Sequence, residues 1–297
     1  MSGRLAVVGL GPGDERYLTP EAAVALADAQ ALYGYGPYLD RVPARAGQSR
    51  HPSDNREEAA RAAEALGQTA QGVSVAVVSG GDPGVFAMAA AICEQIATGP
   101  DTWRTLDVVF IPGVTAMLAV AARIGAPLGH DFCAVSLSDN LKPWPLIERR
   151  LDAAAQAGFA IALYNPVSRA RPWQFASAVE RLRRHLPPTA PVIFGRAVGR
   201  PDERVTVTTL ESAANEAADM ATLVIVGTRE TRVIERPGRS PLVYTPRWIP
   251  RALAEAIARS SHAITSSTVS TAGASDGAGR RSMITSMPSA RAAAILP

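Results

Sequence analysis

Three short loops rich in glycine and proline each follow directly after an apolar run, and this arrangement constrains the fold more than any other feature. The runs are Leu5–Leu10, Val73–Ser79 and Leu106–Ile111, and the loops are Gly9–Asp14, Ser79–Gly84 and Pro112–Ala116. Apolar runs bounded by turn residues are typical of buried strands in a parallel sheet. Because ligands of open α/β sheets bind at the carboxyl ends of the strands, we expect the three loops to line one crevice.

Helical patterns alternate with the predicted strands, which indicates α/β units on a largely parallel sheet. Thr19 is a good N-cap for a helix that runs from Pro20 to Ala31, and Asp54 with Glu57 is a capping pair for a helix that ends at Gln71. A segment rich in helix breakers, Arg123–His130, separates the two halves of the chain. We therefore expect an N-terminal α/β domain at residues 1–126 and a C-terminal one at 127–250.

The second half is also predicted to be α/β, with a finish rich in strands. The predicted strands are Phe132–Ser138, Phe159–Tyr164, Val192–Phe194, Val205–Leu210 and Leu223–Gly227, and the predicted helices are Pro145–Ala157 and Pro172–Leu186. Residues 251–297 are dominated by Ser, Thr, Ala and Arg, a composition that buries too little apolar surface to order a chain. We expect a disordered tail there, in preference to a basic arm that binds nucleic acid, because the charges are sparse.

Composition excludes several classes of protein. With 47% hydrophobic and 19% charged residues and a net charge of +3, the chain has the profile of a globular domain and no strong basic patch for nucleic acid. No apolar run approaches the roughly 20 residues that span a bilayer, and no signal peptide is recognisable, so we expect a cytoplasmic protein. The two cysteines, Cys93 and Cys133, lie far apart and form no CxxC pair, and we expect no metal.

The first loop, Gly-Leu-Gly-Pro-Gly-Asp, does not fit a dinucleotide site. The GxGxxG pattern needs glycine where this chain has Asp14, and Pro12 removes an N–H that would face a pyrophosphate. No loop carries the GxxxxGK[ST] pattern of a triphosphate site. A plain turn without a ligand explains one such loop, but three converging loops favour a ligand with many polar atoms and a fixed shape, such as a nucleoside.

The loops GLGPGD, SGGDPG and PGVTA, in this order, resemble those of the tetrapyrrole methylases, which use S-adenosylmethionine. Four further segments look like the branch of that family that methylates C17 of precorrin-3B and contracts the corrin ring in cobalamin synthesis: Tyr33–Arg41, Ser53–Ala62, Leu163–Gln174 and Gly195–Val205. The resemblance covers Arg4 to Arg247 and implies two α/β domains with the active site in the cleft between them. It also implies a homodimer.

The resemblance further implies which residues contact the cofactor. In the three N-terminal loops these are Pro12, Gly81, Asp82, Pro83, Val85, Thr115 and Ala116. In the second half they are Asn165, Ala197 and Val198. The cofactor is then S-adenosyl-L-methionine and the product S-adenosyl-L-homocysteine. Because a sulfonium is already an activated methyl donor and a pyrrole-derived carbon is a nucleophile, positioning can supply most of the catalysis.

Ring contraction needs one more group, because a hydroxyl proton must leave as a carbonyl forms. We predict Asp14 for this role, with capping of the turn as the alternative. A precorrin also carries acetate and propionate arms, for which arginine is the preferred partner. The second half offers four arginines in loops that match the family pattern, Arg169, Arg171, Arg196 and Arg200, with solvated surface charge as the alternative.

Two other functions stay open. One is a different corrinoid C-methyltransferase of the same fold, including an enzyme for the cobalt-bearing precorrin-3, or more remotely a methyltransferase for RNA or protein. The other is a protein that holds a tetrapyrrole without converting it. Aromatic residues make up only 5% of the chain, which disfavours an RNA-directed enzyme. The absence of a cysteine-rich segment favours the metal-free, oxygen-dependent substrate.

Overall fold

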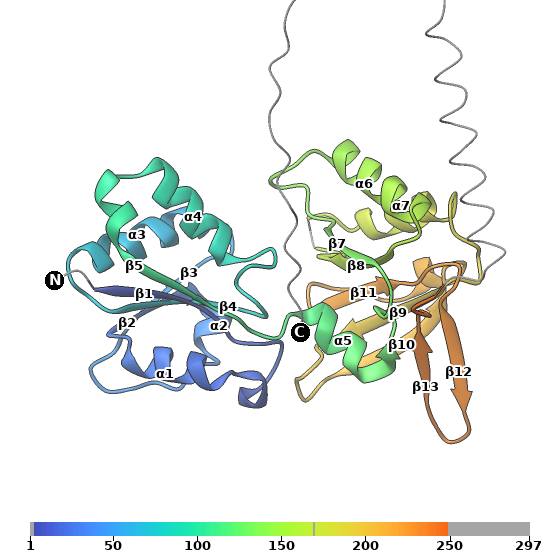
Figure 1. Ribbon diagram of the computed structural model, residues 1–297, viewed down its shortest axis with the longest axis horizontal. Helices are drawn as coiled ribbons and strands as arrows, with labels where there is room; N and C mark the ends of the chain where they lie inside the picture. The colour runs from blue at the N-terminus through green and yellow to red at the C-terminus, as the bar shows by residue number, and fades with distance from the viewer. Residues whose placement is uncertain (1–2, 169, 249–297) are drawn as a thin grey trace, which may run out of the picture. The chain divides into compact units, whose positions relative to one another are not determined.

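The computed structural model describes residues 3–168 and 170–248, which form one compact unit built around two five-stranded sheets (Figure 1). The first sheet has the order β3-β2-β4-β1-β5 and all its strands are parallel. Its strands are β1 (Arg4–Gly9), β2 (Ala31–Tyr35), β3 (Ser49–Ser53), β4 (Val75–Ser79) and β5 (Asp107–Ile111). The helices of this half are α1 (Pro20–Asp28), α2 (Gly36–Leu39), α3 (Glu58–Ala70) and α4 (Met88–Thr98).

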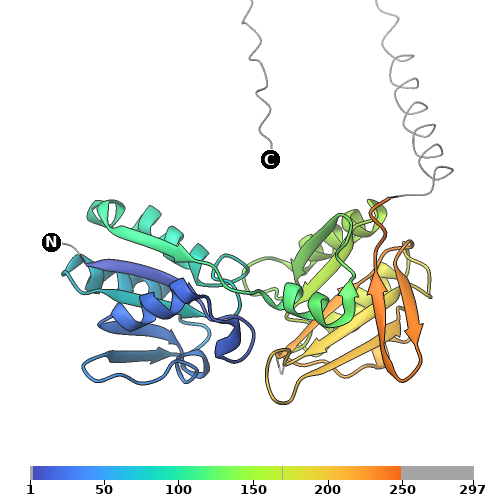
Figure 2. The ribbon, with the colours of Figure 1, turned by 60° about the horizontal axis from the view of Figure 1, so that its bottom comes forward.

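Helices cover both faces of the first sheet, as the apolar strand sequences require (Figures 1 and 2). Along β1, Ala6 and Val8 pack with α1 on one face, whereas Leu5 and Val7 pack with α3 and α4 on the other. Gly9 at the end of β1 is in register with Ser79 of β4. The three glycine-rich loops therefore begin side by side, at one edge of the sheet.

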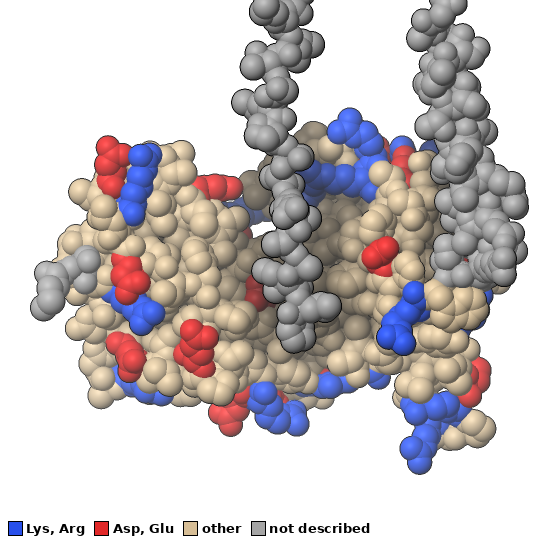
Figure 3. All heavy atoms as spheres, in the orientation of Figure 1, with Lys and Arg blue, Asp and Glu red and all other residues tan. Residues whose placement is uncertain are grey.

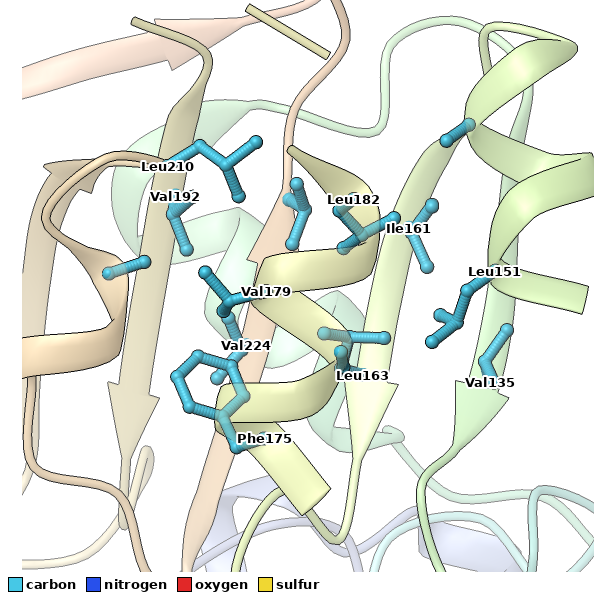
Figure 4. Close-up of a cluster of buried hydrophobic side chains, with 14 of the residues drawn as sticks. Val135, Leu151, Ile161, Leu163, Phe175, Val179, Leu182, Val192, Leu210 and Val224 are labelled. Atoms are coloured by element: carbon cyan, nitrogen blue, oxygen red, sulfur yellow. The ribbon is translucent and has the colours of Figure 1, made fainter. Parts of the chain in front are cut away.

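The second sheet has the order β10-β9-β11-β8-β7 and is mixed: β7 and β8 are parallel, and the other pairs are antiparallel. Its strands are β7 (Phe132–Ser136), β8 (Ala160–Tyr164), β9 (Pro191–Arg196), β10 (Arg204–Thr209) and β11 (Thr222–Val226). On one face, α6 (Trp144–Gln156) and α7 (Gln174–Leu182) bury Leu151, Phe175 and Leu182 against the strands (Figure 4). A third sheet joins β6 (Gly125–Ala126), β12 (Arg232–Arg236) and β13 (Arg239–Tyr244).

Helix α5 (Ala116–Ile124) covers the other face of the second sheet. Its residues Val120 and Ile124 pack with Ile193, Ile225 and Val243, so this helix shares a core with the C-terminal strands. The division of the chain at residues 126 and 127 stays a prediction. Because α5 packs with the C-terminal strands, the chain passes from the first sheet to the second half in the loop between β5 and α5.

The predicted helix caps were correct at α1 and correct only in part at α3. Thr19 caps α1 as predicted, because its Oγ1 accepts a bond of 3.1 Å from the Ala22 N–H. The predicted capping pair was wrong in part: Glu57 accepts from the Asp54 N–H at 2.8 Å, but the Asp54 carboxylate accepts from Asn55 and α3 begins only at Glu58. A turn thus precedes this helix, closed by the backbone bond of 3.2 Å from the Glu57 N–H to the Asp54 oxygen.

Several elements were not predicted from the sequence. Strands β2 and β3 and the hairpin of β12 and β13 lack the long apolar runs of the other strands, and the helix expected to reach Ala31 ends at Asp28 so that β2 can begin. The predicted tail at 251–297 and the substrate candidate Arg169 lie outside the described residues. Among the helices that the structure describes, none is long and apolar enough to cross a membrane.

Candidate functional site

The three glycine-rich loops pack against one another backbone to backbone. Gly11 and Gly81 exchange two hydrogen bonds, with N···O distances of 3.1 and 2.9 Å. A Cβ on Gly9 would lie 2.7 Å from the Gly81 oxygen, and a Cβ on Gly113 would lie 2.3 Å from the same atom. Glycine is required at these positions because the loops touch each other, in addition to any approach to a ligand.

Asp82 joins the second loop to the third. Its Oδ1 accepts from the Gly84 N–H at 2.8 Å, and its Oδ2 accepts from the Gly113 N–H at 3.0 Å. The neighbouring Pro83 is buried, and its carbonyl accepts from Ala89 at the start of α4. Both residues were predicted to contact the cofactor. The structure places them in the framework that holds the loops, and neither lines the cavity described below.

The first loop also contacts the second half of the chain. The Asp14 N–H donates to the Gly199 oxygen at 3.1 Å, and a Cβ on Gly13 would lie 1.8 Å from that oxygen. The Asp14 carboxylate caps the turn at Glu15–Tyr17 and pairs with Arg16 at 2.8 Å, and these hydrogen bonds lower the pKa of Asp14. Asp14 does not line the cavity, and its catalytic role stays a prediction.

One cavity receives all three loops together with loops of the second half. Of the residues predicted to bind cofactor or substrate, its wall contains Pro12, Gly81, Val85, Thr115, Ala116, Asn165, Ala197, Val198 and Arg200. Residues far apart in the chain meet here, as the bond of 3.3 Å from Arg200 Nε to the Pro12 oxygen, 188 positions away, illustrates. The structure therefore brings most of the predicted site together, and the contacts of each residue with a ligand stay predictions.

Backbone strain is concentrated in this wall. Phe86, Asn165 and Ala197 have φ angles of 52°, 53° and 49°, and among the described residues no other non-glycine position has positive φ. All three line the cavity. Such conformations cost of order 1–3 kcal/mol each and persist mainly at functional sites, where surrounding structure holds them. The three strained residues therefore indicate a functional site, and this indication does not depend on the sequence motifs.

Tyr164 connects the two halves inside the wall. Its hydroxyl lies 2.6 Å from Thr115 Oγ1 and accepts from the Met117 N–H at 3.2 Å. Burial is the main cause that raises the pKa of Tyr164. The ring of Phe86 lies 5.1 Å away, between centroids, and covers it. Tyr164 thus fixes the start of α5 relative to β8.

Arg171 and Arg196 do not line the cavity. Arg171 pairs with Asp139 at 2.9 Å, and Arg196 pairs with Asp202 at 2.7 Å and Asp219 at 2.9 Å. These carboxylates already neutralise the guanidinium groups. Of the arginines predicted to bind substrate, Arg200 is therefore the one that the structure brings into the cavity wall.

The wall also contains polar and aromatic residues that were not predicted individually. They include Tyr35, Tyr38, Arg41, Glu58, Arg61 and Phe86. A signal existed for several of them, because Tyr33–Arg41 and Ser53–Ala62 carry the family resemblance. Arg61 gave a second signal: it occupies the buried face of α3 beside Ala62 and Ala65, where an apolar residue is normal.

A second hollow lies beside α1 and has a volume of about 430 Å³, against about 220 Å³ for the first. Val24, Ala25 and Val109 line it, and it receives none of the glycine-rich loops. The first cavity is the better candidate because loops, strain and unpaired cations meet there. No group of three or more metal-ligating side chains occurs among the residues that the structure describes.

Comparison with known proteins identifies similar chains. Residues 4–214 match the model of the family described as Tetrapyrrole (Corrin/Porphyrin) Methylases. A precorrin-3B C(17)-methyltransferase of Sinorhizobium sp is 64% identical over 248 residues, which are 84% of this chain and 98% of the relative. A probable cobalt-factor III C(17)-methyltransferase of Salmonella typhimurium is 38% identical over 82% of this chain and 98% of the relative.

Solved structures agree with these relatives. The methyltransferase CobJ superposes with a TM-score of 0.78 at 50% identity, covering 82% of this chain and all of that one. A uroporphyrin-III C-methyl transferase from Thermus thermophilus, complexed with S-adenosyl homocysteine, has a TM-score of 0.60 at 23% identity over 76% of this chain and 97% of its own. The second likeness concerns the fold alone.

Proposed function

The chain belongs to the tetrapyrrole (corrin/porphyrin) methylases, and we propose that it transfers a methyl group from S-adenosylmethionine to C17 of precorrin-3B, with ring contraction to precorrin-4. The observation that carries this proposal is the 64% identity to the Sinorhizobium enzyme over 98% of that enzyme's length. It agrees with the methyltransferase activity, the cofactor and the α/β fold expected from the three loops. The reaction belongs to cobalamin biosynthesis.

The cavity wall fits the cofactor. Gly81 has a φ of 70°, which side chains rarely adopt, and it lines the cavity together with Thr115 and Ala116. Pro12 and Val85 contribute small apolar surfaces from the first and second loops, and Asn165, Ala197 and Val198 complete the wall from the second half. We propose that these residues hold S-adenosylmethionine. Asp82 and Pro83 then act by keeping the second loop in place.

When bound, S-adenosylmethionine supplies a methyl group whose bond to sulfur breaks as the bond to C17 forms. The chain's own residues orient the two reactants and exclude water, which can supply much of the barrier reduction. Ring contraction requires a group that accepts the proton of the substrate hydroxyl. We keep Asp14 as the proposed acceptor, although its carboxylate pairs with Arg16 outside the wall. Glu58 is the carboxylate residue in the wall itself.

The metal-free substrate is favoured over a cobalt-bearing one by the comparison of identities. The relative named for precorrin-3B is 64% identical, whereas the one named for cobalt-factor III is 38% identical. The similarity to the second relative makes a cobalt-bearing corrinoid the second candidate. The two substrates can be compared directly in one assay.

We further propose a homodimer in the cytoplasm, where S-adenosylmethionine is available, without a nucleic-acid partner. The homodimer is supported by the family resemblance alone. Against nucleic acid stand the aromatic content of 5% and the net charge of only +3. On the face drawn in Figure 3, basic and acidic side chains are interspersed, in contrast to the continuous basic surface that binds a phosphate backbone.

The test is incubation of the full chain with precorrin-3B and methyl-labelled S-adenosylmethionine, followed by mass spectrometry and NMR of the product. We expect one labelled methyl group at C17 and a contracted ring. A parallel incubation with the cobalt-bearing substrate should give slower turnover. Methylation at another carbon would overturn the assignment to C17. Absence of S-adenosylhomocysteine binding in calorimetry would instead favour a protein that holds tetrapyrroles without converting them.

A further inference from the structure

Arg41 enters the cavity wall with much of its guanidinium unused. Its Nη2 donates to three carbonyl oxygens of the first loop, those of Leu10, Gly11 and Gly13, at 2.8, 2.9 and 2.6 Å. Its Nε and Nη1 are buried and have no hydrogen-bond partner among the described residues. A guanidinium has five N–H donors, so three of those on Arg41 are available to a ligand.

Arg61 is a second buried cation in the same wall, with only 3% of its surface exposed. Its Nε donates to Ser53 Oγ at 2.7 Å, and its Nη2 donates to the Asp54 carbonyl oxygen at 2.6 Å. Its Nη1 faces the sulfur of Met88 at 3.2 Å, which is a weak acceptor. Within the described part of the chain, neither Arg61 nor Arg41 forms an ion pair with a carboxylate.

Burial of these cations is unfavourable in the protein alone. Burial lowers the pKa of Arg61, and burial together with the charge of Arg200 lowers the pKa of Arg41. A buried guanidinium without a counter-ion loses solvation that a carboxylate ligand can restore. Arg200 adds a third positive charge to the wall, against the single carboxylate of Glu58. The cavity therefore has an excess of positive charge and attracts an anion.

The two arginines lie along a different part of the sheet edge from the loops that are proposed to hold the cofactor. Those loops follow β5, β1 and β4, which are consecutive in the strand order. Arg41 follows β2 and α2, and Arg61 bonds Ser53 at the end of β3, so both belong to the β2 and β3 side. Arg61 therefore lies on the side of the edge away from the proposed cofactor loops, whereas Arg41, which bonds the first loop, lies at the boundary between the two parts.

We propose that Arg41 and Arg61 bind carboxylate arms of the tetrapyrrole and so fix which carbon of its rim faces the methyl donor. This inference rests on the proposed function, because a precorrin carries acetate and propionate arms around its rim. Unlike Arg41 and Arg61, Arg171 and Arg196 are paired with aspartates, and their role in substrate binding stays a prediction. The cofactor's own amino-acid carboxylate is the competing source of the same chemistry, and the experiment distinguishes the two.

The experiment measures kcat and KM for precorrin-3B, and the Kd for S-adenosylhomocysteine by calorimetry, in Arg41→Met and Arg61→Met. We expect each change to raise the KM of the tetrapyrrole about tenfold or more, as for loss of a charge-assisted hydrogen bond. The Kd for S-adenosylhomocysteine should stay within twofold in Arg61→Met. Arg41→Met also removes the bonds that hold the first loop, so Arg61→Met is the variant that separates substrate from cofactor. Arg61→Lys should recover part of the loss, because it keeps the charge without the planar fork. Arg149→Met, on the exposed face of α6, is the control and should match the wild type.

The outcomes separate the hypotheses. A KM within twofold of the wild type in folded Arg61→Met would overturn the assignment of Arg61. A KM unchanged with a weakened Kd for S-adenosylhomocysteine would assign the arginines to the cofactor carboxylate. Arg41 also holds the first loop, so Arg41→Met can fail to fold. In that case Arg41→Lys tests its role. A wild-type KM in this lysine variant would contradict recognition of the carboxylate by the planar guanidinium. A wild-type enzyme without methyl transfer would refute the proposed function itself.

Discussion

Replacement of Gly113 by alanine tests whether the glycine-rich loops are held together by their own backbones. The new Cβ would lie 2.3 Å from the Gly81 oxygen, whereas ordinary contacts begin near 3.4 Å, so the two loops must separate by about 1 Å. The second loop is bonded to both of the others, so its displacement lengthens two hydrogen bonds beyond their limit. They are the bond from Gly11 N to the Gly81 oxygen, now 3.1 Å, and the bond from Gly113 N to Asp82, now 3.0 Å.

The expected destabilisation follows from these two bonds. The neutral one contributes about 0.5–1.5 kcal/mol and the one to a carboxylate about 1.5–3 kcal/mol, so Gly113→Ala should lower the free energy of unfolding by about 2–4 kcal/mol. In a chain of this size that is a fall in Tm of roughly 5–15 °C. Because Gly81 lines the cavity, the affinity for S-adenosylhomocysteine should fall as well.

The assay is thermal unfolding followed by circular dichroism, with calorimetric titration of S-adenosylhomocysteine. Gly67→Ala is the matched control, because Gly67 lies within α3 and a Cβ there meets nothing within 4 Å. Helix propensity predicts a gain of about 0.5–1 kcal/mol for this control. A Tm of Gly113→Ala within 2 °C of the wild type, with unchanged affinity for S-adenosylhomocysteine, would show that the loops are not held by this contact.

Three further changes test other parts of the site. Asp14→Asn should depress turnover while sparing S-adenosylhomocysteine affinity, and a wild-type kcat in steady-state kinetics would leave Asp14 as a turn residue. Glu58→Gln, at the carboxylate in the cavity wall, is measured in parallel. Tyr164→Phe leaves the Met117 N–H without its acceptor and should cost about 1–3 kcal/mol in urea unfolding, whereas a loss under 0.5 kcal/mol would contradict this role. Hydrogen bonds from Arg181, and next His185, lower the pKa of Asp152 despite partial burial, so its ionised form favours the folded state. That stabilisation is complete above the unfolded pKa of about 3.9 and is lost as pH falls through the lower folded pKa, so the Tm advantage over Asp152→Asn should shrink below about pH 4; an equal gap at pH 3 and pH 6 would refute it.

The sequence by itself determined the family, the cofactor and the position of the glycine-rich loops. These features depend on short-range signals: an apolar run followed by Gly and Pro predicts where a buried strand ends, whatever else surrounds it. The Thr19 cap of α1 is determined in the same way. The first sheet was correspondingly well predicted at β1, β4 and β5, and less well at β2 and β3, where the apolar pattern is weaker.

Only the tertiary structure decided which arginines face the cavity. Arg196 and Arg61 are alike as residues, but Arg196 meets Asp219 from 23 positions further along the chain, whereas Arg61 is buried with no carboxylate in contact. The sequence pattern does not predict which arginine pairs with which carboxylate, because ion pairing depends on how loops from distant strands converge. For the same reason the sequence predicted only that the third loop lines a crevice, whereas in the structure its Gly113 packs against the Gly81 backbone. Burial and charge pairing are properties of the assembled fold.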